Sequence, residues 1–269
     1  MLKKLLRKLI IPKKKPLVIL SIAGSDNSSG AGIQADIKTA KYLNAYCLTT
    51  LTCITSQNSQ KVSKVFPIPV SVVLSQIEMV KEEYNINGVK IGLLTDYKLV
   101  NPLKKILSIL NVPIVIDPIY QSTNGKKFMN KKDFVNMYFS LSKIANFLTP
   151  NLNEAKLLLS NSYNKNFSKK EILSVLYKKF KIPIILTGGE DNENYSNDLL
   201  ISKKGIKEFK LKKVKSNKTH GSGCSFSTAL TIYLANGETI EESIRLAKQY
   251  IKKTILNSPS LGIGYGPIS

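Results

Sequence analysis

Short apolar runs alternate with amphipathic helical patterns along almost the whole chain, and this alternation restricts the fold more than any single motif does. Runs rich in β-branched residues predict strands at 17–22, 45–56, 89–91, 112–116, 146–148 and 182–186. Apolar residues at helical spacing predict helices at 33–43, 70–84, 99–110, 134–144, 226–235 and 240–255. Strands that alternate with helices are typical of a mostly parallel sheet covered on both faces. We therefore expect an α/β fold, a three-layer αβα sandwich, with edge strands added at 197–202 and 208–213.

The connections are short and no Gly/Ser-rich linker divides the chain, so its 269 residues predict one large domain. Residues 1–16 differ from the rest because they carry lysine and arginine but no acid, and Pro12 and Pro16 end the segment. No small-residue cleavage site follows them. We expect a basic N-terminal extension at 1–16 and a single domain at 17–269.

The net charge of +22 raises the question of a nucleic-acid or membrane partner. The lysines gather at 1–16 and 203–218 and are otherwise scattered, with no interleaved aromatic platform. This distribution favours solvated lysine faces over nucleic-acid binding, and no apolar run approaches the length of a membrane span. We expect neither partner. Three cysteines without a CxxC motif indicate a reducing compartment, hence the cytoplasm.

Polar or glycine-bearing residues follow the carboxyl ends of successive predicted strands. They are Gly24-Ser25-Asp26, Gln57-Asn58, Gly92, Asp117, Thr149 with Asn151, and Thr187-Gly188-Gly189. In open α/β sheets, ligands bind in the crevice outside the carboxyl ends of the strands. The sequence therefore predicts a ligand site at this edge of the sheet.

The run His220-Gly221-Ser222-Gly223-Cys224-Ser225 leads into a predicted buried helix. A helix N-terminus offers unpaired N–H groups and the positive end of the dipole, which together suit an anion. The same field would favour the thiolate of Cys224. The run thus predicts an anion site with a candidate base. We expect His220, the only histidine, to position the loop, with a proton relay as the alternative.

Each of three further features has a functional and a structural interpretation. Asp36, one turn into the first predicted helix, either accepts a hydrogen bond from a substrate or complements the helix dipole. Asn151 and Glu154 share one helix face and either support a hydrated Mg²⁺ or form a helix cap. The glycine-rich tail LGIGYGP is either a flexible terminus or a loop that closes near a nucleotide.

Several of these segments occur together, in order and spacing, in a known family. They resemble segments of the hydroxymethylpyrimidine and phosphomethylpyrimidine kinases of thiamine biosynthesis, in the ribokinase-like superfamily. The matching segments are SIAGSDNSSGAGIQADIKTA, TSQN, KIGLL, TPNLNEA and KTHGSGCSFSTAL. The resemblance covers roughly 17–267. It implies a ribokinase-like fold and the transfer of phosphate from ATP, with Mg²⁺, to 4-amino-5-hydroxymethyl-2-methylpyrimidine and to its monophosphate. It also implies a homodimer.

The resemblance further implies a role for each matching position. The implied pyrimidine contacts are Gly24, Asp36, Gln57 and Leu93. The implied nucleotide contacts are Asn151, Thr187, Gly189 and Ser222, and the implied metal-associated acids are Glu154 and Asp117. Gly221 and Gly223 correspond to the anion hole, and Cys224 to the position where ribokinases carry an aspartate base and this family a cysteine.

The chain departs from the family pattern at the nucleotide end. Thr187 stands where the family usually has a lysine that reaches the ATP phosphates, and Glu190 where it usually has a histidine. Where the family has the segments DPVM and SGD, this chain has Asp117-Pro118-Ile119-Tyr120 and Asn124-Gly125-Lys126. Two alternatives follow: a pyridoxal kinase of the same superfamily, and a non-catalytic descendant that binds a small molecule.

Overall fold

The computed structural model describes residues 15–188, 194–259 and 261–268, which contain one mixed sheet of order β3-β2-β1-β4-β5-β6-β7-β8-β9. The strands are β1 (Leu17–Asp26), β2 (Ala45–Gln57), β3 (Val62–Pro67), β4 (Gly88–Ile91), β5 (Ile114–Ile116), β6 (Phe147–Leu148), β7 (Ile184–Leu186), β8 (Tyr195–Ser202) and β9 (Gly205–Lys212). The block from β2 through β7 is parallel, whereas β3, β8 and β9 join antiparallel at the two edges. The prediction of a mostly parallel sheet with added edge strands is confirmed.

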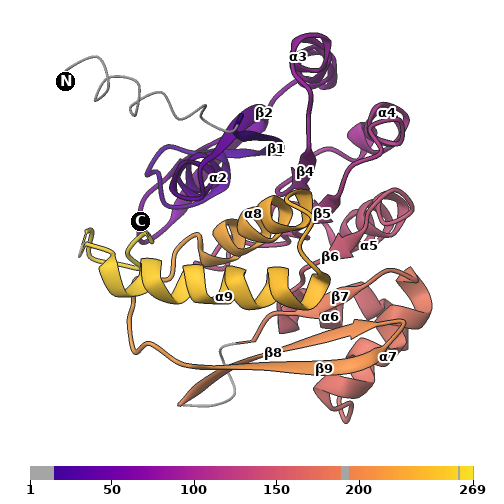
Figure 1. Ribbon diagram of the computed structural model, residues 1–269, viewed down its shortest axis with the longest axis vertical. Coiled ribbons are helices and arrows are strands. Elements are labelled where there is room, and N and C mark those ends of the chain that lie inside the picture. The colour runs from indigo at the N-terminus through magenta and orange to yellow at the C-terminus, as the bar shows by residue number, and fades with distance from the viewer. Residues whose placement is uncertain (1–14, 189–193, 260, 269) are drawn as a thin grey trace, which may run out of the picture.

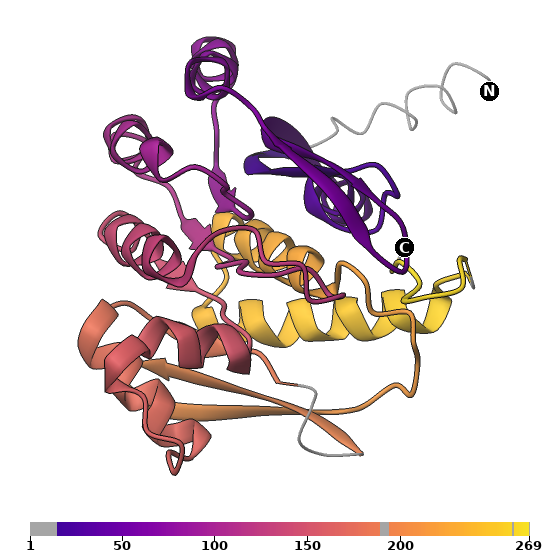
Figure 2. The same cartoon turned by 180° about the vertical axis from the view of Figure 1, so that it is seen from behind.

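Helices cover both faces of the sheet, as Figure 1 and the reverse view in Figure 2 show. One face carries α2 (Gly32–Tyr42), α8 (Ser222–Ala235) and α9 (Ile240–Asn257). The other carries α3 (Val70–Glu83), α4 (Val100–Leu107), α5 (Lys131–Leu141), α6 (Leu152–Leu159) and α7 (Lys169–Phe180). The predicted αβα sandwich is therefore present. Among the described residues no helix is both long and apolar enough to span a bilayer.

The short central strands are apolar throughout because the sheet is buried on both sides. In β5, Ile114 and Ile116 join the core beneath α3 to α7, while Val115 between them joins the core beneath α8 and α9. Successive strand residues point to opposite faces, so one three-residue strand contributes to both cores.

Most predicted elements are found, but β3 and α7 were not predicted, and of α6 only the start at 151–154 was. The edge strand β3 and the helix α7 lie in polar stretches whose lysines mask their apolar residues. In α7 the buried stripe is Ile172, Leu173, Leu176 and Phe180, and Ser168 caps its start with Glu171. The missed signal was the Ser-x-x-Glu capping box.

The topology places the ligand site. From β1 the chain runs outward to β2 and β3 in one direction and through β4 to β7 in the other, which makes the β1/β4 boundary the switch point of the sheet. Ligands of open α/β sheets bind at such a point. Helix α8 packs against β1, β4 and β5, so its first turn reaches the same edge.

Candidate active site

A cavity of about 510 Å³ opens at the carboxyl ends of the parallel strands. It falls within the size range of small-molecule sites. The residues singled out from the sequence that line it are Gly24, Gln57, Leu93, Asp117, Asn151, Glu154, Thr187, Gly221, Ser222, Gly223 and Cys224. Gly189 lies outside the described residues. The structure thus brings together positions spread over two hundred residues of sequence.

Two glycine-rich segments close against each other at the floor of this cavity. Gly221 has a φ of +83°, and a Cβ there would lie 1.8 Å from the Gly30 carbonyl oxygen. A Cβ on Gly30 would lie 2.1 Å from the His220 ring. A side chain at Gly221 would require the backbone to move, and one at Gly30 would displace the His220 ring. The AGSDNSSGAG loop and the HGSGC turn therefore form one contiguous surface.

The first turn of α8 faces the cavity with backbone amides available. Ser222 N donates to Thr219 O and Ser225 N donates to Gly221 O. Within the described residues, no acceptor is found for the amides of Gly223 and Cys224 between them. Such amides at the positive end of a helix dipole suit a phosphate group.

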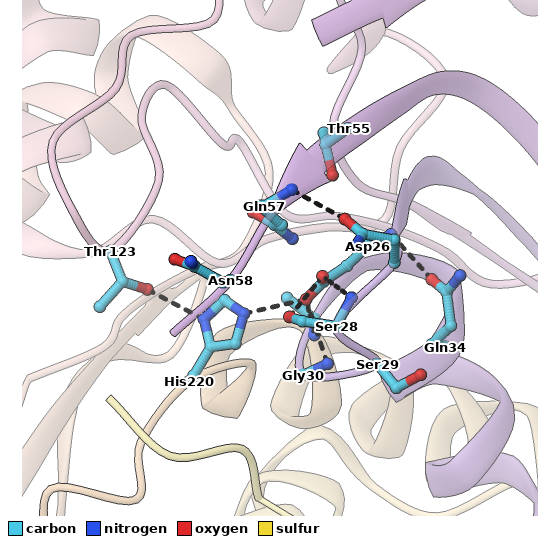
Figure 3. A network of polar contacts seen from close by, with 12 residues as sticks. Asp26, Ser28, Ser29, Gly30, Gln34, Thr55, Gln57, Asn58, Thr123 and His220 are labelled. Carbon is cyan, nitrogen blue, oxygen red and sulfur yellow. Dashed lines mark hydrogen bonds and ion pairs between the residues drawn. The ribbon is translucent and has the colours of Figure 1, made fainter. Parts of the chain in front are cut away.

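Asp26 is the hub of the polar network in Figure 3. Its carboxylate accepts from Ser28 N at 2.7 Å and from Ala31 N at 2.8 Å, and His220 Nε2 donates to it at 2.9 Å. Burial alone would raise the pKa of Asp26, but the hydrogen bonds from His220 and Ser28 hold it well below its usual value. The carboxylate therefore stays ionised and holds both glycine-rich segments.

His220 also joins two segments that cover the cavity. Its Nδ1 lies 3.4 Å from Thr123 Oγ1, on a small hairpin that follows β5 and lines the cavity (Figure 3). Its backbone N–H donates to Gly266 O and its carbonyl accepts from Ile268 N. These contacts agree with the predicted positioning role of His220. The glycine-rich tail packs on the rim, and Tyr265 lines the cavity.

Comparison with known proteins identifies the family. Residues 26–269 match the family model of phosphomethylpyrimidine kinase. The chain belongs to the phosphomethylpyrimidine kinase family. It is 33% identical over 250 residues to the hydroxymethylpyrimidine/phosphomethylpyrimidine kinase of Aquifex aeolicus, a match that covers 93% of this chain and 98% of that protein. The resemblance predicted from the motifs is confirmed.

Solved structures of two kinds of kinase are similar to this chain. The pyridoxal kinase from Staphylococcus aureus is 28% identical with a TM-score of 0.84, covering 95% of this chain and 94% of that one. The phosphomethylpyrimidine kinase from Clostridium difficile is 30% identical with a TM-score of 0.75, covering 89% and 99%. These similarities confirm the ribokinase-like fold.

Two buried carboxylates, Asp117 and Glu154, line the cavity. Burial raises the pKa of Asp117 to about 6, partly offset by Lys90, and burial together with the charge of Asp117 raises the pKa of Glu154 to about 8. No cluster of three metal-ligating side chains occurs in the part of the chain that is described. Two oxygen donors suit Mg²⁺, which usually keeps several waters and binds substrate phosphates as well.

The structure confirms the helix-cap interpretation of Asn151 and Glu154. Asn151 Oδ1 accepts from Glu154 N at 2.9 Å, and Glu154 Oε2 accepts from Asn151 N at 2.9 Å. This capping box fixes Glu154 at the start of α6. One carboxylate oxygen is engaged in the cap and the other accepts from Tyr120 N at 3.4 Å, so a hydrated ion fits Glu154 better than a fully dehydrated one.

The prediction of a resident Cys224 thiolate is wrong. Cys224 is 7% exposed, and burial raises the pKa of its thiol to about 12, although the Lys90 ammonium opposes the rise. The carboxylates of Asp117 and Asp36 add to the rise. Desolvation therefore outweighs the helix dipole, and the thiol is protonated at neutral pH.

The prediction that Asp36 contacts substrate or complements the helix dipole is also wrong. Its side chain is fully buried and does not line the cavity. The carboxylate accepts from Lys90 Nζ at 2.9 and 3.0 Å, from Thr228 Oγ1 at 2.7 Å and from Ser21 Oγ. Asp36 is one half of a buried ion pair beneath the site. Burial alone would lower the pKa of Lys90, but Asp36 raises it above its usual value.

Sequence analysis missed Lys90, although a signal was present. Lys90 is the one charged residue in the apolar run from Val89 to Leu94, a place where lysine is rare unless it is paired. The hairpin carrying Thr123 was also missed, since it has no periodic pattern. Asp26 was noted only as part of a glycine-rich loop.

Replacing Lys90 by methionine tests the ion pair. Lys90→Met leaves Asp36 as an uncompensated buried charge and is expected to lower the free energy of unfolding by about 3–5 kcal/mol. The double variant Asp36→Asn/Lys90→Met should recover part of this loss. Urea unfolding followed by circular dichroism measures both. Lys81→Met, which removes the partly exposed partner of Glu78 on the surface of α3, is the control and should cost about 0–1 kcal/mol. An equally small cost for Lys90→Met would contradict the assignment.

Proposed function

We propose that this chain transfers the γ-phosphoryl group of ATP to 4-amino-5-hydroxymethyl-2-methylpyrimidine and then to its monophosphate, in thiamine biosynthesis. The observation that carries the proposal is the convergence of three features on one cavity. They are the available amides at the start of α8, the buried carboxylates of Asp117 and Glu154, and the polar strand ends at Gly24 and Gln57. Phosphoryl transfer depends mainly on positioning and charge stabilisation, which this arrangement supplies.

The two ends of the cavity have different proposed occupants. Gly24, Gln57 and Leu93, which line the cavity at the ends of β1, β2 and β4, would hold the pyrimidine ring. On the α6 side, Asn151 and Thr187, with Gly189 by resemblance, would hold the nucleotide, together with Ser222 at the start of α8. Glu154 and Asp117 would hold Mg²⁺, which when bound neutralises phosphate charge.

The turn from Gly221 to Cys224 lies between these two ends. Its amides would stabilise charge on the phosphoryl group in transfer, a contribution of about 2.7–4 kcal/mol per donor in other enzymes. Cys224 is proposed to accept the hydroxyl proton. Because its thiol is protonated in the free protein, only the small thiolate fraction would be competent. The monophosphate acceptor is already ionised and needs no base.

The charge of the nucleotide would be balanced without a lysine in the cavity wall. Among the described lining residues there is no lysine and no arginine, which agrees with Thr187 in place of the family's usual lysine. Backbone amides and the metal ion would carry the compensation. We also propose a homodimer, as in the resembling family, and a cytoplasmic location, supported by the three free cysteines.

Turnover of the pyrimidine tests the proposed activity. With Mg-ATP, the full chain is expected to convert the pyrimidine to the monophosphate and the diphosphate, measured by ³¹P NMR. Pyridoxal in the same mixture tests the second candidate, which the similarity to the Staphylococcus aureus pyridoxal kinase favours. Faster turnover of pyridoxal than of the pyrimidine would make pyridoxal the substrate. Binding of the pyrimidine without any turnover would indicate a non-catalytic descendant.

Replacing Cys224 by serine should affect the two phosphorylations unequally. The first acceptor is a hydroxyl group that must lose a proton, whereas the second is a phosphate oxygen that is already ionised. We expect Cys224→Ser to lower kcat for the first step by about 10²–10⁴-fold and for the second by much less. Separate rate measurements with each acceptor decide the matter, and an equal loss in both steps would refute the base assignment.

The pH dependence of the first step gives an independent prediction. Because the thiol pKa is raised to about 12, the thiolate fraction rises with pH throughout the neutral range. The kcat/KM for the pyrimidine should therefore rise about tenfold per pH unit from about pH 7 to 9. In Cys224→Asp the base is already ionised there, so the tenfold rise per pH unit should disappear and only the smaller rise from ionisation of Glu154, whose pKa is about 8, should remain. A flat profile for the unmodified chain would mean that another group takes the proton.

A further inference from the structure

A buried polar cluster outside the cavity holds the turn that follows β7. We call it the Gly188 clamp, and it consists of Ser196 and Asp198 on β8 and Lys248 on α9. Asp198 and Lys248 are 5% and 7% exposed. None of the three lines the cavity. Their contacts with Gly188 nevertheless determine the course of the backbone next to it.

The clamp engages both polar backbone groups of Gly188. Asp198 Oδ1 accepts from Gly188 N at 2.8 Å, and Ser196 Oγ donates to Gly188 O at 2.7 Å. Lys248 Nζ donates to Asp198 Oδ2 at 2.6 Å and to Ser196 O at 3.2 Å. The lysine thus acts on Gly188 only through the two β8 residues. A charge-assisted pair of this kind fixes geometry more tightly than neutral hydrogen bonds do.

Burial of the Asp198–Lys248 pair needs an explanation beyond stability. Desolvation of two charges can cost as much as their attraction returns, so an apolar pair of similar volume would often serve a core equally well. An apolar pair, however, could not accept a hydrogen bond from the Gly188 N–H. Gly188 also lies tightly against β8, because a Cβ there would be 2.5 Å from Asn197 O. The geometry of the turn is what the buried pair maintains.

The residue next to the clamp lines the cavity. Thr187 N donates to Pro150 O at 3.0 Å, and its Oγ1 donates to the same oxygen at 3.3 Å. Thr187 also forms a parallel bridge with Asn151, which is proposed to contact the nucleotide. Moving Gly188 would therefore move Thr187 and Asn151, two of the residues on the nucleotide side of the cavity.

We propose that Ser196, Asp198 and Lys248 are positioning residues that hold Gly188 and thereby fix the bridged Thr187 and Asn151 on the nucleotide side of the cavity. This inference rests on the proposed function, since it assumes that ATP occupies this end of the cavity. A cavity wall that is already fixed before the ligand arrives loses little conformational freedom on binding.

Ligand binding to three variants tests the clamp. Ser196→Ala and Lys248→Met should each raise the Kd for ADP about tenfold, the effect of one lost hydrogen bond to a well-placed group. The Kd for the pyrimidine should change less than about twofold. Lys248→Arg keeps the charge and should recover part of the ADP affinity. Arg245→Met, on the same helix but in an exposed pair with Glu242, is the matched control and should bind ADP like the unmodified chain.

Hydrogen exchange of the Gly188 amide provides a readout that needs no nucleotide. It should accelerate in Lys248→Met and stay unchanged in Arg245→Met. Faster exchange with unaltered ADP affinity would overturn the inference, and so would equal weakening of ADP and pyrimidine binding. If the unmodified chain binds the pyrimidine but not ADP, the proposed nucleotide site fails and the inference fails with it. Failure of the proposed nucleotide site would thus be seen with the unmodified chain, whereas failure of the clamp alone would be seen only in the variants.

Discussion

One buried carboxylate supports the arrangement on which the site depends. Asp36 of α2 accepts hydrogen bonds from Ser21 on β1, Lys90 on β4 and Thr228 on α8. The contacts of Asp36 thus join β1 and β4, the two strands at the switch point of the sheet, to α2 and α8, the helices that pack over them. A charge in a fully buried place is tolerated only while all of its partners remain. The pair therefore fixes α8 relative to β1, and with it the position of the anion-binding turn over the strand ends.

Above this ion pair, close contacts between the loop after β1 and the turn before α8 leave no space for larger side chains. Gly30 and Gly221 touch backbone to backbone, and the Asp26–His220 pair joins the same two segments by their side chains. The hairpin that carries Thr123 and the C-terminal tail both contact His220. The loop after β1, the start of α8, the hairpin and the C-terminal tail are thus held around one residue, His220, through its ring and its backbone. The cavity is a preformed one, as small-molecule sites usually are.

Sequence analysis predicted the layers, the parallel sheet and most of the cavity wall, because strand periodicity and the strand-end rule are local signals that the fold preserves. It placed Asp36 wrongly because the partner of that carboxylate, Lys90, lies 54 residues away and only tertiary packing brings the two together. It also misjudged the Cys224 thiol, since the helix position is readable from sequence whereas the depth of burial is not. The capping box at Asn151 was foreseen as an alternative, and its geometry is local.

The central claim is that one cavity places an acceptor hydroxyl and the end of a triphosphate together at the start of α8. A crystal structure of the chain with Mg²⁺, the non-hydrolysable analogue AMP-PCP and 4-amino-5-hydroxymethyl-2-methylpyrimidine tests it most directly. The account predicts the γ-phosphate on the amides of Gly223 and Cys224, with the hydroxymethyl oxygen between it and the Cys224 sulfur. A triphosphate bound away from α8, or a pyrimidine whose hydroxymethyl group points away from Cys224, would contradict it.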